Sequence, residues 1–482
     1  MFRSIISMIF ALTLTGAEAQ YISQVLEFMP APGQFTNTVP WGSPAASETI
    51  AGKRDGTMSL GAFGGYVIFR FEKAVENHPD NPFGVDFTIF GNPTADWSEP
   101  GVVRVMEDEN SNDLPDDTWY ELAGSDRWFS TTISNYRVTY RNPGGADLDV
   151  PWTDDRGDSG VVRSISAHTQ PYYPLPDSFP GIPGDTYTLT GTLIKGYLDT
   201  ATPPLIRSGR RAFGYADNRE RGDARTFLPD NPYTSELEHS GGDAFDIRWA
   251  VDPSGQYVDL DSIHFIMVQT AMMGHGGWLG EVSTEITGAI DVSPDRSVQG
   301  ETDLVVIRDL PQVIRVPEFQ IEVFVLSRGR IQEGKEIRWE VEMEGGDETG
   351  QVPGARVDET NLLILERSGK LSLTASLVQD PSIRATVTAA VDLESTGYER
   401  TTAAGREVCL YPNPATGRIF IRLPGAGGGF EISVYDAAGK RCIRSFAVGA
   451  QTSLDVIELP AGIYFMEIRG ERGNSRHRFI KQ

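Results

Sequence analysis

Short runs of β-branched and aromatic residues, each bounded by glycine, proline, asparagine or aspartate, recur along almost the whole chain. Residues 66–71, 102–106, 187–193 and 245–250 are four of these runs. Such runs are typical of β-strands, and the residues between them are typical of turns. The 51 glycines and 30 prolines are spread between the runs rather than gathered into one tract. The pattern predicts an all-β protein built from many short strands.

The length of 482 residues exceeds what a single hydrophobic core usually organises, so we expect a multidomain chain. We divide it into a signal peptide over residues 1–19, an N-terminal β-sandwich that holds a ligand site over 20–292, an Ig-like β-sandwich over 297–398 and a small β-sandwich over 406–482. A jelly-roll-like arrangement is the natural packing for the many short strands of residues 20–292.

The first residues have the order of an export signal. Arg3 supplies a positive start, residues 5–14 are apolar, and Ala17-Glu18-Ala19 is a small-x-small cleavage site. The mature protein is expected to begin at Gln20. No later stretch approaches the roughly 18 to 20 continuous apolar residues that a transmembrane helix needs. We therefore expect a secreted protein without a membrane span.

Charge and cysteine content limit the partners of the chain. The net charge is −25, although residues 406–482 carry 11 Lys and Arg against 7 Asp and Glu. The acidic part before residue 406 repels nucleic acid and anionic lipid, so no nucleic-acid partner is expected; it suits divalent cations or a solvated acidic surface. Cys409 and Cys442 are the only cysteines, so no disulfide framework holds the front part. Whether these two pair is left open.

Residues 297–398 show apolar and polar alternation at 319–326 and at 336–341, and strand-like runs at 361–366 and 370–377. Trp339 stands in the middle of one such run, like the core tryptophan of an immunoglobulin domain. The segment resembles bacterial Ig-like repeats, without their disulfide. The resemblance implies a spacer, with direct binding as the alternative.

Residues 406–482 contain five strand-like runs, at 418–423, 430–435, 441–446, 463–468 and 476–480. They also contain four motifs: Tyr411-Pro412-Asn413-Pro414 with Gly417, Ser433-Val434-Tyr435-Asp436 with Gly439-Lys440, Leu459-Pro460-Ala461-Gly462-Ile463-Tyr464, and Arg478-Phe479-Ile480-Lys481. In this order the motifs resemble the C-terminal sorting domain of type IX secretion, the Por secretion tail. The resemblance implies that residues 406–482 engage the type IX secretion machinery. It also implies export across an outer membrane, followed by attachment to the cell surface or release.

The front segment has its own set of distinctive stretches. They are residues 59–66, 86–92, 97–100, 151–154, 170–174, 213–217 and 277–281. Together they resemble a family of bacterial cell-surface proteins that are often encoded near cobalamin or nutrient uptake systems. The resemblance implies capture of an extracellular ligand, such as cobalamin or a glycan, rather than chemistry on it.

The sharpest local motif spans residues 108–117 and has the oxygen spacing of a calcium-binding EF-loop. Its candidate ligands are Asp108, Asn110, Asn112, the carbonyl of Leu114, Asp116 and Asp117. Two positions depart from the pattern, because Asp113 stands where glycine is usual and Trp119 where a bidentate glutamate is usual. Because the oxygen spacing is otherwise kept, calcium is the expected cofactor. A polar turn rich in Asp and Asn is the alternative.

Six tryptophans of the front segment could form a stacking platform for a sugar or a corrin-like ring. They are Trp97, Trp119, Trp128, Trp152, Trp249 and Trp278. The neighbours of Trp97 and Trp278 are polar or glycine, which indicates loops. His275 lies in a glycine-containing segment where an imidazole could coordinate a metal. We expect Trp97, Trp128, Trp278 and His275 to contact the ligand, whereas a core role is the alternative for each tryptophan.

No catalytic motif is present in the sequence: a nucleophile elbow, a zinc-protease helix and a phosphate-binding loop are all missing. We therefore expect no enzymatic activity and no catalytic residues. The sequence favours a surface-displayed binding protein. The alternatives are a structural or adhesive surface protein and a glycan hydrolase, whose two carboxylates would have to meet in one cleft.

Overall fold

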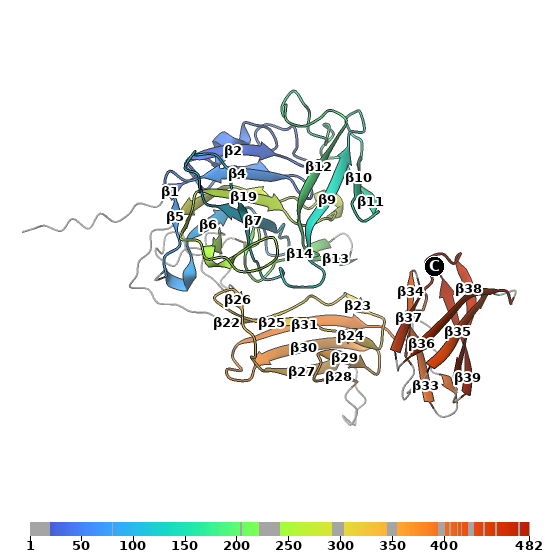
Figure 1. The fold of residues 1–482 in the computed structure, drawn as a ribbon. Coiled ribbons are helices and arrows are strands. Elements are labelled where there is room, and N and C mark those ends of the chain that lie inside the picture. Colours follow the sequence, from blue (N-terminus) through green and yellow to red (C-terminus); the bar gives the residue numbers. More distant parts are fainter. Residues whose placement is uncertain are drawn as a thin grey trace, which may run out of the picture. The chain divides into compact units, whose positions relative to one another are not determined.

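The computed structural model describes residues 20–79, 81–202, 205–220, 242–291, 303–344, 354–393, 401–403, 406–411, 413–415, 417–422, 429–436, 439–448, 451–470 and 473–481. The predicted signal peptide lies outside these ranges. The chain divides into two compact units, Met1–Val306 with Phe324–Gly334 and Ile307–Val323 with Lys335–Gln482. Almost all regular structure in the described ranges is β, which confirms the all-β prediction (Figure 1).

The first unit is built on a seven-stranded antiparallel sheet. Its strands, in spatial order, are β17 (Ala250–Val251), β8 (Trp119–Leu122), β7 (Gly101–Met106), β19 (Phe265–Thr270), β4 (Tyr66–Arg70) and β2 (Gln24–Met29), with β15 (Tyr215–Ala216) paired to β7. Gln269 of β19 pairs with Tyr66 of β4 on one side and with Val102 of β7 on the other. β19 is therefore a central strand, and it leads directly into the loop that carries His275.

A second antiparallel sheet of this unit shares a core with the first. It consists of β1 (Gln20–Tyr21), β21 (Gly288–Asp291), β6 (Phe87–Phe90) and β16 (Gly242–Phe245). The core contains Phe69 from β4, Ile266 from β19, and Phe87 and Ile89 from β6. Because side chains from both sheets meet there, the two sheets form a β-sandwich, as expected for this segment.

A third sheet has its own aromatic core. Its strands are β11 (Ser159–Val162), β10 (Val150–Asp154), β9 (Ile133–Arg141) and β12 (Thr186–Leu193). Tyr136, Tyr140, Tyr172 and Tyr187 are buried together in this core. The hydroxyl of Tyr187 donates a hydrogen bond of 2.9 Å to the carbonyl oxygen of Pro30. Buried tyrosines with bonded hydroxyls give this sheet a rigid face.

Shorter elements complete the first unit. They are the pairs β13 (Tyr197–Thr202) with β14 (Leu205–Gly209), β18 (Ser262–Ile263) with β5 (Val75–Glu76) and β20 (Glu285–Ile286) with β3 (Met58–Ser59), the helix α1 (Ala46–Ile50), and the 3-10 turns η1 (Pro82–Gly84), η2 (Ile247–Trp249) and η3 (Gly277–Leu279). No described helix is long and apolar enough to cross a membrane.

A hairpin from the predicted Ig-like segment belongs to the first unit. A three-stranded sheet contains β22 (Asp303–Ile307), β25 (Val323–Ser327) and β26 (Arg330–Ile331). The indole N–H of the buried Trp249 donates a hydrogen bond of 2.9 Å to the carbonyl oxygen of Arg328. Arg330 donates to the carbonyl oxygen of Arg248 at 2.6 Å and lies 4.7 Å from the ring centre of Tyr257. These contacts explain why Phe324–Gly334 clusters with the front unit.

The second unit begins with two sheets from the Ig-like segment. One consists of β23 (Val313–Ile314), β31 (Arg384–Val391), β30 (Gly369–Leu377) and β27 (Ile337–Glu344), and the other of β24 (Glu318–Gln320), β29 (Leu362–Leu365) and β28 (Ala355–Val357). Trp339 of β27 is only half-buried, and its indole N–H donates to Asn361 Oδ1 at 2.9 Å. Trp339 therefore stands in the middle of a strand, as predicted, and is partly buried.

The last part of the chain is a small antiparallel sandwich, as predicted. One sheet consists of β32 (Thr401–Ala403), β33 (Arg406–Tyr411), β34 (Arg418–Arg422) and β37 (Gln451–Asp455), and the other of β36 (Arg441–Val448), β35 (Gly429–Asp436), β38 (Gly462–Gly470) and β39 (Gly473–Lys481). Ile419 and Ile421 from the first sheet share a core with Ile432 and Met466 from the second. Cys442 is free and exposed.

Two predicted strands differ from the structure. Residues 245–250 form the end of β16, the turn η2 and the start of β17, because the Asp246 carboxylate accepts a hydrogen bond of 2.7 Å from the Arg248 N–H. A side chain that satisfies a nearby backbone N–H competes with strand pairing. Residues 319–326 are split between β24 and β25 rather than forming one strand.

Candidate functional site

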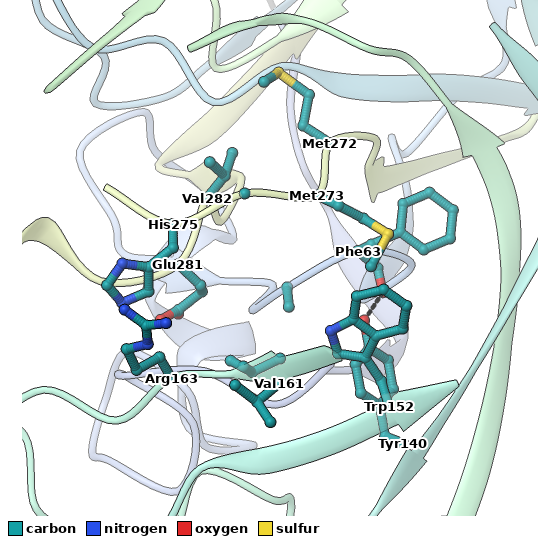
Figure 2. Close-up of a pocket in the computed structure, with 13 residues that line it drawn as sticks. Phe63, Tyr140, Trp152, Val161, Arg163, Met272, Met273, His275, Glu281 and Val282 are labelled. Carbon is teal, nitrogen blue, oxygen red and sulfur yellow. Dashed lines mark hydrogen bonds between the residues drawn. The ribbon is translucent and has the colours of Figure 1, made fainter. Parts of the chain in front are cut away.

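A cavity of about 290 Å³ lies in the first unit, between the third sheet and the loop that follows β19 (Figure 2). It is lined by Ala62, Phe63, Tyr140, Trp152, Val161, Val162, Arg163, Met272, Met273, Gly274, His275, Glu281 and Val282. Its volume is near the lower end of the roughly 300 to 1,000 Å³ that is usual for small-molecule sites. Figure 2 shows an apolar group around Trp152 at one side and a polar group around His275 at the other.

The apolar side is built on the third sheet. Trp152 of β10 stands opposite Tyr140 of β9, whose hydroxyl donates a hydrogen bond of 2.8 Å to the carbonyl oxygen of Phe63. Burial raises the pKa of Tyr140 far above its usual value, so the hydroxyl stays protonated and keeps this bond. An added Cβ on Gly160 would lie 2.5 Å from Trp152 Cζ2. Glycine at position 160 therefore makes room for the indole.

The polar side is organised by His275 and Glu281, which face each other across an isolated antiparallel bridge. Residues paired in this way direct their side chains to the same face. His275 Nδ1 accepts a hydrogen bond of 3.0 Å from the backbone N–H of Gly277. A nitrogen that accepts carries no proton, so the neutral ring carries its proton on Nε2. Nε2 is buried and has no hydrogen-bond partner among the described residues.

Glu281 supplies the complementary group and is 2% exposed. Its Oε1 accepts a hydrogen bond of 2.8 Å from the backbone N–H of Gln34, whereas Oε2 has no partner in the part of the chain that the structure describes. Burial raises the pKa of Glu281 to about 7. Burial, together with the charge of Arg163, lowers the pKa of His275, which favours its neutral form. Both residues line the cavity, so an unsatisfied donor and an unsatisfied acceptor lie buried in its wall.

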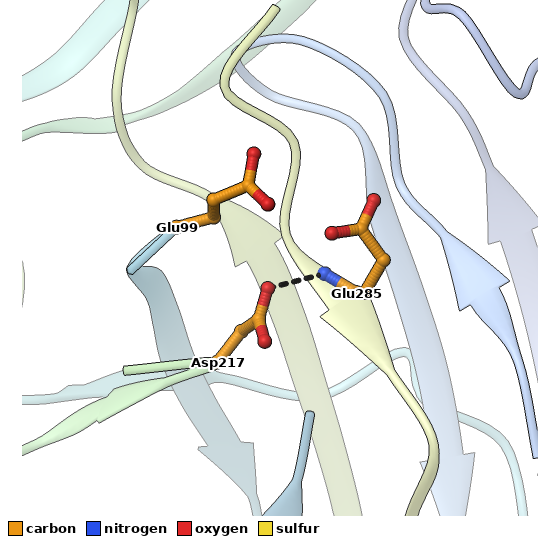
Figure 3. A group of neighbouring side chains, drawn as sticks. All are labelled: Glu99, Asp217 and Glu285. Carbon is orange, nitrogen blue, oxygen red and sulfur yellow. Dashed lines mark hydrogen bonds between the residues drawn. The ribbon is translucent and has the colours of Figure 1, made fainter. Parts of the chain in front are cut away.

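Three carboxylates from separate segments also meet inside the first unit (Figure 3). Glu99 precedes β7, Asp217 follows β15 and Glu285 begins β20, and one oxygen of each lies within 4.8 Å of the others. They are 8%, 0% and 4% exposed, respectively. Asp217 accepts from the backbone N–H of Asn92 at 2.9 Å and from that of Glu285 at 2.8 Å. We call these three residues the buried carboxylate cluster.

Burial raises the pKa of each carboxyl group in the buried carboxylate cluster, and repulsion from Glu285 raises the pKa of Glu99 and of Asp217 further. Such a group of acids stays buried only when protons or a cation neutralise part of its charge. Three oxygens at this spacing suit a hard cation such as Ca²⁺. A proton held by one of these carboxyl groups would serve equally well.

The predicted calcium ligands lie in one exposed loop between β7 and β8. They are Asp108, Asn110, Asn112, Leu114, Asp116 and Asp117. The side-chain amide of Asn112 donates to both carboxylate oxygens of Asp116, at 3.2 and 3.1 Å. The Asn110 amide donates to Asp116 at 3.2 Å and to Asp117 at 3.1 Å. Asp108 accepts from the backbone N–H groups of Asn112 and Asp113 at 3.1 and 2.9 Å. The Asn amide N–H groups, rather than the amide oxygens, face the aspartates, so the observed bonds are those of a polar turn, and calcium binding stays a prediction.

Four residues were predicted to contact the ligand, and His275 is the one of them that lines the cavity. Trp97 is half-buried against Gly276, and Trp128 is half-buried with the Arg127 guanidinium 5.3 Å from its ring centre. Trp278 lies in η3 and is 68% exposed. None of these three tryptophans is among the lining residues. Trp152, from the wider set of candidate aromatics, does line the cavity.

Sequence reasoning assigned no role to Glu281 or to the buried carboxylate cluster. The signal that could have found them was the set of distinctive front-segment stretches, because Glu99, Asp217 and Glu281 each lie in one of these. A buried acid is rare unless it is paired or bound to a ligand. Arg163 and Met273 lie in no such stretch.

Comparison with known families decides the role of the last segment. Residues 409–482 match the model of the secretion system C-terminal sorting domain. This segment is a type IX secretion sorting domain. The match confirms the resemblance predicted from the four motifs, and it makes the chain a secreted cargo that interacts with the type IX machinery. No curated protein matches the chain.

Solved structures give only distant likenesses. A pair of titin immunoglobulin domains is 12% identical and covers 38% of this chain and 97% of its own, with a TM-score of 0.13. The Yersinia pseudotuberculosis adhesin InvE is 9% identical and covers 38% of this chain and 58% of its own, at 0.13. Latent PorU from Porphyromonas gingivalis is 10% identical and covers 72% of this chain and 34% of its own, at 0.15. At these scores the likenesses carry no argument about function.

Proposed function

We propose that the chain is an exported binding protein whose first unit captures a small extracellular ligand in the cavity beside Trp152. The observation that carries this proposal is the pairing of an apolar wall with two buried polar atoms that lack a partner, His275 Nε2 and Glu281 Oε2. A buried polar group without a partner costs roughly 1 to 3 kcal/mol. A ligand that bonds to both atoms removes this cost and is therefore bound selectively.

The placement of the tryptophans supports binding over a purely structural or adhesive role. A structural protein has no need to keep aromatic rings beside a cavity. Trp249 is 1% exposed and serves the core, but Trp152 lines the cavity. The aromatic groups of the first unit are thus not all used for packing.

The cavity also supports binding over glycoside hydrolysis. Hydrolysis of a glycosidic bond uses two carboxyl groups about 5 to 10 Å apart on either side of the bond. Glu281 is the single carboxylate among the thirteen described residues that line the cavity. We therefore propose that the first unit has no hydrolase activity.

The volume of the cavity narrows the choice of nutrient. A cobalamin carries a corrin macrocycle and a nucleotide tail, and it is far larger than a cavity of about 290 Å³. One sugar ring or a small aromatic molecule matches this volume, and an aromatic wall beside polar groups is suited to either. Within the proposal, a single glycan residue or another small nutrient is therefore favoured over a whole cobalamin.

The remaining parts fit the same role. We propose that the Ig-like segment is a spacer and that the exported protein stays attached to the outer membrane. We also propose that Ca²⁺ stabilises the first unit through residues 108–117, where the side chains of Asp108, Asp116 and Asp117 gather in one loop. The support for calcium is the supply of hard oxygen ligands in a tight loop.

A thermal-shift screen of the chain from Gln20 tests the proposal. The panel contains monosaccharides, N-acetylated sugars, small indoles and cobalamin, each with calcium or with a chelator. A ligand present at 100 times its dissociation constant adds roughly 2.7 kcal/mol of stability. A shift that Trp152→Ala removes and Trp278→Ala keeps supports the cavity as the site. A panel without any shift contradicts the proposal.

A further inference from the structure

The polar end of the cavity defines a narrower class of ligand, and this inference rests on the proposed function. We propose that the cavity takes a neutral ligand with a carboxamide edge. The amide N–H of the ligand donates to Glu281 Oε2, and its carbonyl oxygen accepts from the N–H of His275 Nε2. The apolar body of the ligand lies against Trp152 and Met273.

The donor and acceptor roles follow from bonds that the protein already makes. The Gly277 N–H donates a hydrogen bond of 3.0 Å to His275 Nδ1, which leaves Nε2 as the proton-bearing donor. The Gln34 N–H donates a hydrogen bond of 2.8 Å to Glu281 Oε1, which leaves Oε2 as the remaining acceptor. Both remaining atoms are buried and without a partner. The bridge between residues 275 and 281 directs them to the same side.

Other polar groups match this pair less well. A ligand carboxylate offers no proton to Glu281 Oε2 and places a second negative charge beside it. A ligand ammonium offers no acceptor to His275 and meets the positive charge of Arg163, which lies beside the other two in Figure 2. A primary carboxamide carries a donor and an acceptor side by side in one planar group, and it brings no net charge into a buried site.

The opposite side of the cavity favours a flat or ring-shaped body. Trp152, Tyr140 and Phe63 form its aromatic part, and Figure 2 shows the Met273 side chain beside them. Aromatic faces and a flexible thioether pack well against a planar ring. Indole-3-acetamide, indole-3-acetate and tryptamine carry an amide, a carboxylate and an ammonium group on the same ring, and they form a matched set of probes.

The test is calorimetric titration of the chain from Gln20 with the three probes at pH 8.5. At this pH Glu281 is ionised, because burial raises its pKa only to about 7. We expect the amide to bind at least 10-fold more tightly than the carboxylate or the amine, since one lost hydrogen bond of about 1.4 kcal/mol is tenfold in affinity. Glu281→Gln retains an oxygen for the Gln34 N–H but replaces the free acceptor with a donor. It should weaken amide binding about 10-fold and strengthen carboxylate binding.

A second variant tests the donor of the pair separately. In His275→Asn the side-chain oxygen can replace Nδ1 as acceptor for the Gly277 N–H, and the Nε2 donor is lost. It should also weaken amide binding about 10-fold, whereas the exposed control Trp278→Ala should leave it unchanged.

Equal or tighter binding of indole-3-acetate or tryptamine by the unchanged chain would overturn the inference while leaving a small-ligand cavity in place. Amide binding that both variants leave unchanged would overturn it as well. Failure of all three probes to bind overturns the carboxamide inference, and the proposed function falls with it only if the thermal-shift panel also gives no ligand.

Discussion

Removing the charge of Glu281 should stabilise the first unit at alkaline pH and leave its stability unchanged at acid pH. Glu281 is 2% exposed, and burial raises its pKa from 4.5 to about 7. When a folded-state pKa lies above the unfolded value, the stability that the group contributes is fully present below the unfolded pKa. It is lost as the pH rises through the folded pKa. For Glu281 this loss therefore falls between about pH 4.5 and pH 7.

The size of the effect follows from the two pKa values. Their difference is equivalent to about 3 kcal/mol, because one pH unit corresponds to about 1.4 kcal/mol. Glu281→Gln is isosteric and cannot ionise. We expect its free energy of unfolding to equal that of the unchanged chain at pH 4 and to exceed it by about 3 kcal/mol at pH 8.5.

Urea titration followed by tryptophan fluorescence measures this difference, because seven of the eight tryptophans lie in the first unit. Other buried acids contribute equally to both proteins and cancel in the comparison. Glu72→Gln, at an exposed position, is the matched control and should stay within about 0.5 kcal/mol of the unchanged chain at every pH. A difference for Glu281→Gln that is the same at pH 4 and pH 8.5 would show that ionisation of Glu281 does not change the stability of the first unit.

Three further outcomes are expected. Trp152→Ala should weaken binding of any ligand found in the thermal-shift screen about 10-fold in calorimetry, because it removes the aromatic wall; unchanged affinity would place the ligand elsewhere. Asp116→Asn combined with Asp117→Asn should abolish a calcium-dependent rise in Tm, whereas Asp217→Asn should keep it; the reverse result would move the cation to the buried carboxylate cluster. Trp249→Phe should lower the free energy of unfolding of the first unit by about 1 to 3 kcal/mol in urea titration, because it removes the indole N–H that donates to the Arg328 carbonyl oxygen; a loss under 0.5 kcal/mol would show that other contacts hold the hairpin.

The strands were largely predictable because their signal is local. Alternation and turn residues located β7, β12, β27 and β30 to within a few residues, and the four sorting motifs located the last sandwich. The prediction of one strand at residues 245–250 was wrong because a single carboxylate, that of Asp246, caps a 3-10 turn within this apolar run. The assignment of Phe324–Gly334 to the first unit depends on contacts with Trp249 and Tyr257, about 70 to 80 positions away, which no local pattern reveals.

The candidate site was only partly predictable because its residues meet through long-range pairing. His275 was selected from its glycine-containing loop, and it does line the cavity. Trp152 reaches the same cavity from β10, more than 100 positions earlier in the chain. The polar neighbours of Trp97 indicated a ligand contact, but in the structure this ring packs against Gly276. Only the fold shows which loop residues share a cavity.

Crystals of the chain from Gln20, soaked with a library of small neutral fragments, test the central claim most directly. Bound fragments should gather in the cavity, with a polar atom within hydrogen-bonding distance of Glu281 Oε2 or His275 Nε2 and a ring against Trp152. Fragments that bind only at exposed aromatics such as Trp278, or that leave the cavity without a ligand at every soak, would contradict the claim that this unit captures a small molecule there.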